Sequence, residues 1–157
     1  MRGIKFALVV SIVLFLVDCG GGGTDPSGNI TTNYQNVDYP GSFLDSGSNG
    51  FFFLNSTTLG ASMPTCSDKQ GWYCPSTPQT FTITNKGVTG TSSSATFTVG
   101  NADQLFLNSN NTAVPTLGGN WPLSPLVFDL GFPFFYGRTI YTKIGSVQAQ
   151  SNGGFAY

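Results

Sequence analysis

The sequence predicts an all-β protein, and three observations support this fold class. The 157 residues include 16 Ser, 18 Thr, 12 Asn, 21 Gly and 9 Pro, a composition that disfavours long helices and suits strands joined by turns. Short apolar or aromatic runs alternate with turn residues, and no long stretch after the first thirty residues has a helical period. The length fits one domain.

Two segments show the clearest strand pattern. Residues 81–84 and 96–99 alternate apolar side chains with threonines, which is typical of half-buried antiparallel strands. Residues 85–87 and 92–94 are expected to form the turn or long hairpin end between them. Further strands are expected at residues 30–37, 42–45, 51–54, 139–144 and 154–157, with one helical turn at residues 102–106.

The N-terminal segment, residues 1–19, has the outline of a signal peptide. Arg2 and Lys5 precede an apolar run over residues 6–17 that only Ser11 interrupts. Twelve helical residues would rise about 18 Å, well short of the roughly 30 Å hydrocarbon core of a membrane. The segment therefore predicts export rather than a membrane-spanning anchor.

The end of this segment resembles a bacterial lipobox. Residues 16–19 finish in Asp18-Cys19 and are followed by four glycines, so the resemblance implies lipidation of Cys19 and a Gly-rich tether over residues 20–29. Asp18 departs from the pattern, because the residue before the cysteine is normally small. The alternative is a secreted chain that is cleaved near the glycines.

The cysteine count is odd, and it agrees with export. Lipidation of Cys19 leaves Cys66 and Cys74, which seven residues separate, and an oxidising compartment would join them. A loop this short would gain on the order of 2 to 3 kcal/mol from the cross-link. Two free buried thiols are the alternative, while two cysteines without His are too few ligands for structural zinc.

Charge and residue types exclude several functions. Charged residues make up 8% of the chain and His is absent, so neither a nucleic-acid footprint nor an imidazole base is expected. Acid–base chemistry would depend on the 7 Asp, because the chain contains no Glu. No cofactor or metal is predicted.

The motif that carries chemistry lies in residues 42–50, where an apolar strand end leads into Asp45, Ser46, Gly47 and Ser48. A catalytic carboxylate needs a rigid loop whose glycine permits close backbone approach and whose hydroxyls and amides hold its oxygens. The loop resembles the catalytic loop of aspartic proteases. An Asp-Ser-Gly turn with no catalytic role is the simpler interpretation.

Several other segments match the C-terminal lobe of pepsin-like proteases in the same order. Leu130-Gly131 is similar to the apolar-Gly strand that packs beside the catalytic loop in that family. An alternative register uses Gly137 and Arg138 and resembles retroviral proteases; the residues after Gly131 favour the first. The remaining matching segments are residues 30–32, 96–99, 102–106, 134–135, 139–142 and 154–156.

The closest resemblance is to a domain-of-unknown-function family of Gly-rich bacterial lipoproteins that is itself similar to aspartic proteases. It covers residues 30–157 and rests on the blocks at residues 43–53, 72–75 and 132–138. It implies a single aspartic-protease-like lobe, a pepsin- or retropepsin-type β-barrel half, after a signal peptide. Such a lobe carries one of the two carboxylates that this chemistry needs.

The resemblance implies an envelope lipoprotein, periplasmic or at the cell surface, that is inactive as a monomer. The second carboxylate would come from Asp45 of a second copy in a homodimer, or from a separate first lobe. Ser46 would then bridge the two loops, and Ser48 would hydrogen-bond the carboxylate. Gly131 and Arg138 would give structural support, and Asp103 and Asp129 are interpreted as turn or capping residues. The alternative function is a non-catalytic binding or structural lipoprotein, or a truncated relative of a two-lobe enzyme.

Overall fold

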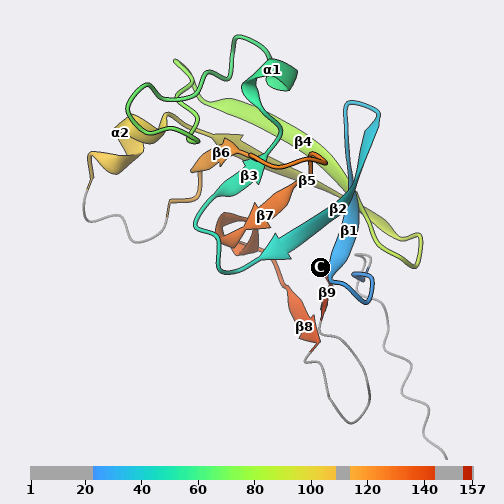
Figure 1. Ribbon diagram of the computed structural model, residues 1–157. Helices are drawn as coiled ribbons and strands as arrows, with labels where there is room; N and C mark the ends of the chain where they lie inside the picture. The colour runs from blue at the N-terminus through green and yellow to red at the C-terminus, as the bar shows by residue number, and fades with distance from the viewer. Residues whose placement is uncertain (1–22, 109–113, 144–153, 157) are drawn as a thin grey trace, which may run out of the picture.

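The computed structural model describes residues 23–108, 114–143 and 154–156 and is mostly β (Figure 1). Seven strands form one curled sheet in the order β5-β4-β1-β2-β7-β3-β6, and β8 and β9 pair separately. The all-β prediction is confirmed. The strands are β1 (Asn29–Tyr34), β2 (Val37–Asp45), β3 (Phe51–Phe53), β4 (Gln79–Lys86), β5 (Ser92–Val99), β6 (Gly118–Asn120), β7 (Asp129–Gly131), β8 (Tyr141–Lys143) and β9 (Gly154–Ala156). The helical elements are α1 (Ser56–Leu59), α2 (Ala102–Phe106) and the 3-10 helix η1 (Phe132–Phe135).

The first hairpin, β1–β2, corrects one expected strand. Residues 30–37 do not form a single strand, because Gln35 and Asn36 have φ angles of 50° and 65°. Two successive left-handed residues make a tight turn that matches the twist of antiparallel strands. The strand expected at residues 42–45 is consequently the end of a nine-residue strand that returns along β1.

The β4–β5 hairpin has the predicted alternation. Phe81 lies opposite Phe97, and Ile83 lies opposite Ala95, on the buried face. The threonines of both strands face outward, where the hydroxyls of Thr82 and Thr96 lie 3.2 Å apart. Residues 85–86 and 92–94 continue β4 and β5, so of the two predicted alternatives they form the end of a long hairpin; the turn itself lies at residues 87–91.

The core contains a cluster of aromatic side chains. Phe53 is fully buried at its centre. Its ring centroid lies 5.0 to 5.6 Å from those of Tyr73, Phe81, Phe97 and Phe128. Edge-to-face and offset aromatic contacts at this spacing add to the free energy of burial. The run Phe51–Phe53 therefore divides between two faces, with Phe51 and Phe53 inside and Phe52 outside.

The segment before β1 is bound to the domain. The amide of Thr24 donates to Phe155 O at 3.1 Å, and the amide of Val88 donates to Gly23 O at 3.0 Å. The Asp25 carboxylate accepts from the backbone amide of Asn29 at 2.8 Å. The described part of the expected tether is thus hydrogen-bonded to β9 and to the turn between β4 and β5, and Asn29 is already the first residue of β1. Asp18 and Cys19 lie outside the described residues.

The described residues contain no helix that is both long and apolar enough to cross a membrane.

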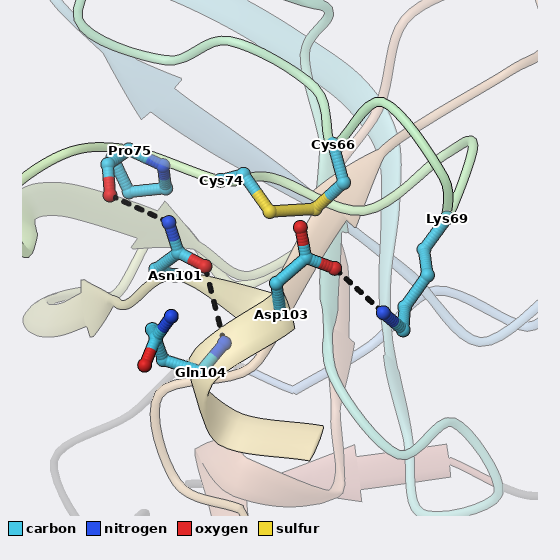
Figure 2. The surroundings of a disulfide bond; sticks show 7 residues. All are labelled: Cys66, Lys69, Cys74, Pro75, Asn101, Asp103 and Gln104. Atoms are coloured by element: carbon cyan, nitrogen blue, oxygen red, sulfur yellow. Dashed lines mark hydrogen bonds and ion pairs between the residues drawn. A yellow bond between two sulfur atoms is a disulfide. The ribbon is translucent and has the colours of Figure 1, made fainter. Parts of the chain in front are cut away.

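The predicted disulfide between Cys66 and Cys74 is present, with an S–S distance of 2.04 Å. It closes the loop over α2, and the Lys69 ammonium group pairs with the Asp103 carboxylate at 2.7 Å (Figure 2). Asn101 caps α2, because its side-chain oxygen accepts from the backbone amide at the third helical position. The disulfide loop includes Trp72, a residue of the site described next.

Candidate functional site

The site begins with the placement of Asp45 at the end of β2. Strand β7 lies between β2 and β3, parallel to β2 and antiparallel to β3, and Gly131 is the register partner of Asp45. The chain leaves β2 at Asp45, makes a tight loop and returns as β3 on the other side of β7 (Figure 1). The loop of residues 46–50 therefore crosses the end of β7.

Both carboxylate oxygens of Asp45 are held by the loop that follows it. The amide of Gly47 donates to Oδ1 at 2.7 Å, and the hydroxyl of Ser48 donates to Oδ2 at 2.7 Å. Asp45 is half-buried, while Ser46 and Gly47 are exposed. The loop thus orients a carboxylate at the surface.

Gly131 lies in close contact with the backbone of the loop. A Cβ atom there would lie 2.8 Å from Ser48 O and closer still to Gly50 O. The next amide, that of Phe132, donates to Ser48 O at 2.7 Å. A glycine is needed here for close backbone approach, and Gly131 is the glycine that pairs with Asp45.

The prediction that Asp129 is a turn or capping residue is wrong. The residue lies in β7 and is only 4% exposed. Its Oδ2 atom lies 2.9 Å from the hydroxyl of Ser48, so Ser48 joins it to Asp45. Burial raises the pKa of Asp129 to about 6; the Asp45 charge acts in the same direction and the Ser48 hydrogen bond opposes it.

The neighbouring strands explain why Asp129 is buried. Its register partners are Phe43 on β2 and Phe52 on β3, so the three side chains share one face of the sheet. Trp121 packs against Phe43 with ring centroids 5.9 Å apart. The sequence could have indicated the burial of Asp129, because its apolar neighbours Val127, Phe128 and Leu130 favour a buried strand.

A cleft of about 600 Å³ lies beside Ser48 and Asp129. Its walls combine aromatic rings with amide side chains, and they include the Gln70–Trp72 segment of the disulfide loop. Three buried polar atoms here have no hydrogen-bond partner among the described residues: Asn120 Oδ1, Trp121 Nε1 and Asp129 Oδ1. The cleft was not predicted from the sequence. Its lining residues are Ser48, Phe52, Gln70, Gly71, Trp72, Asn120, Trp121, Pro122 and Asp129.

Arg138 does not pair with a carboxylate in its described contacts. Its guanidinium group donates to Phe134 O at 2.8 Å and to Thr96 O at 3.2 Å, and it stacks on the Phe134 ring. It links η1 to β5.

The described residues offer one cluster of three potential metal ligands, formed by Cys66, Cys74 and Asp103. The two sulfur atoms are bonded to each other. They therefore cannot act as thiolate ligands, and Asp103 is already paired with Lys69.

Taken together, the fold and the site define an all-β protein with two carboxyl groups bridged by a serine, beside an aromatic cleft. The chain belongs to a family of proteins of unknown function, DUF3443, whose model matches residues 22–157. Comparison with curated proteins and with solved structures finds no match.

Proposed function

We propose that this chain is one carboxylate-bearing lobe of an aspartic-peptidase-like enzyme, with Asp45 as its catalytic carboxylate. One observation carries the proposal: donors of the same loop, Gly47 N–H and Ser48 O–H, each hold one oxygen of Asp45 at 2.7 Å. Such preorganisation is what a carboxylate needs in order to orient a water molecule for attack on a peptide carbonyl.

A complete site requires a second carboxylate facing Asp45 across that water, so that one group is ionised and the other protonated. Asp129 does not fill this role, because it is buried and reaches Asp45 through the Ser48 hydroxyl. The exposed side of the loop, at Ser46 and Gly47, faces away from the core. A second copy or a separate lobe would meet Asp45 there.

The cleft favours a second candidate function, a non-catalytic binding lobe. Its aromatic walls and unpartnered amide and indole atoms are features of binding sites as well as of substrate grooves. Peptidase activity separates the two functions.

Cleavage of a denatured protein substrate should be undetectable for the monomer and should appear in acid when the chain dimerises through the Asp45 loop. Asp45→Asn should reduce the activity by about 10² to 10⁴-fold. The measurement is cleavage from about pH 3 to 7 beside sedimentation analysis of the same sample. Asp103→Asn is the matched control, because Asp103 forms a surface ion pair. Cleavage by a strict monomer, or activity that survives Asp45→Asn, would contradict the proposal.

We also propose that the protein is anchored in the bacterial cell envelope through a lipid on Cys19. Labelled fatty acid should enter the wild-type protein and be lost in Cys19→Ala. Asp18→Ala should speed maturation, because a small residue is normal at that position of a lipobox. Label retained by Cys19→Ala would refute the anchor.

A further inference from the structure

The Ser48 hydroxyl group lies within hydrogen-bond distance of two carboxyl groups. Its oxygen is 2.7 Å from Asp45 Oδ2 and 2.9 Å from Asp129 Oδ2. A serine hydroxyl carries one hydrogen atom and can donate it to one acceptor at a time. If both aspartates were ionised, one of these short contacts would join two oxygens with no hydrogen between them.

We propose that Asp129 is protonated in the working site and donates to Ser48, which in turn donates to Asp45, so that Asp129 is a positioning residue for the Asp45 carboxylate. The chain of two hydrogen bonds then satisfies all three groups. The catalytic meaning of this arrangement rests on the proposed function, whereas the placement of the proton does not.

The surroundings decide which carboxyl group holds the proton. Asp129 is buried and its Oδ1 atom has no partner among the described residues, so its ionised form would leave an unsatisfied charge. Asp45 is half-buried and accepts from the Gly47 amide, which suits the ionised form. The raised pKa of Asp129 agrees with this assignment.

Among the described residues that pair with Asp129 or line the cleft, none is a cation that would favour its ionised form. Strand β2 presents Phe43 and the charged Asp45, and β3 presents Phe52. The cleft contributes no further titratable side chain; its other side chains are Gln70, Trp72, Asn120, Trp121 and Pro122. Asp45 is therefore the charged group that faces Asp129, and its charge favours the neutral form.

Ionisation of Asp129 would break the chain of hydrogen bonds. Ser48 would then have one proton for two repelling carboxylates, and its bond to Asp45 Oδ2 would compete with its bond to Asp129 Oδ2. The hydrogen-bonded arrangement at Asp45 should therefore be lost above about pH 6, where Asp129 releases its proton.

The test follows the carboxyl carbons of ¹³C-labelled aspartate by NMR as the pH is raised from 3 to 8. Asp129 should titrate near pH 6, and Asp45→Asn should shift that midpoint to lower pH. Removal of the Asp45 charge ends the repulsion and frees the Ser48 hydroxyl to donate to ionised Asp129. A midpoint near 4 in the wild type, or one that Asp45→Asn leaves unchanged, would overturn the proposal.

The amide signal of Gly47 gives a second measurement, since this group donates to Asp45 Oδ1. The Gly47 signal should shift near pH 6 in the wild type and in Asp103→Asn. It should not shift in Asp129→Asn, because the side-chain amide of the new asparagine donates to Ser48 at every pH. A shift that persists in Asp129→Asn would overturn the proposal. Neither measurement needs peptidase activity. If both measurements gave the expected result in a dimer that cleaves no substrate, the proposed function would be refuted and the placement of the proton on Asp129 would stand.

Discussion

Replacement of Asp129 by asparagine should remove most of the pH dependence of stability between pH 4 and pH 6. The pKa of Asp129 is about 6 in the folded protein against an ordinary value of 3.8. In this range the unfolded chain has released the proton while the folded chain retains it, so the free energy of unfolding falls as the pH rises. The full change corresponds to about 3 kcal/mol in the wild type.

Urea unfolding at pH 4, 5, 6 and 7 measures this change. The wild type should lose stability up to about pH 6 and then level off, and Asp129→Asn should be nearly flat. Asp25 and Asp38 have lowered pKa values, so their contributions are lost only as the pH falls below about 4 and do not hide the effect. Asp103→Asn should follow the wild-type curve; equal slopes for the wild type and Asp129→Asn would show that Asp129 titrates normally.

The local parts of the fold follow from local sequence patterns. The alternation at residues 81–84 and 96–99 predicts the β4–β5 hairpin, because the buried face of a strand recurs every second residue. Elimination among three cysteines predicts the Cys66–Cys74 bond. The turn between β1 and β2 was not predicted, because Gln35 and Asn36 adopt left-handed conformations that their sequence only weakly indicates.

The site depends on contacts that no local pattern contains. Asp45 and its loop were found from the Asp-Ser-Gly-Ser sequence, and the structure places Gly47 and Ser48 on its carboxylate. Asp129 lies 81 residues from Ser48 and meets it only because β7 inserts between β2 and β3. A parallel pairing of this kind has no hairpin to signal it. The cleft likewise forms where the disulfide loop meets β6 and β7.

Gly131→Ala should destabilise the protein by about 3 kcal/mol, at the upper end of the usual cost of overpacking. The added methyl group would meet Ser48 O and Gly50 O. Because these are backbone atoms, the whole loop of residues 46–50 must shift. This shift would also lengthen the hydrogen bond from the Phe132 amide to Ser48 O. Urea unfolding gives the magnitude, and the Gly47 amide signal reports whether Asp45 has lost its donor. Gly23→Ala is the matched control, because a Cβ there has open space, and it should change stability by less than about 0.5 kcal/mol. If Gly131→Ala were equally neutral, β7 would not hold the Asp45 loop from beneath, and the register that pairs Asp45 with Gly131 would be wrong.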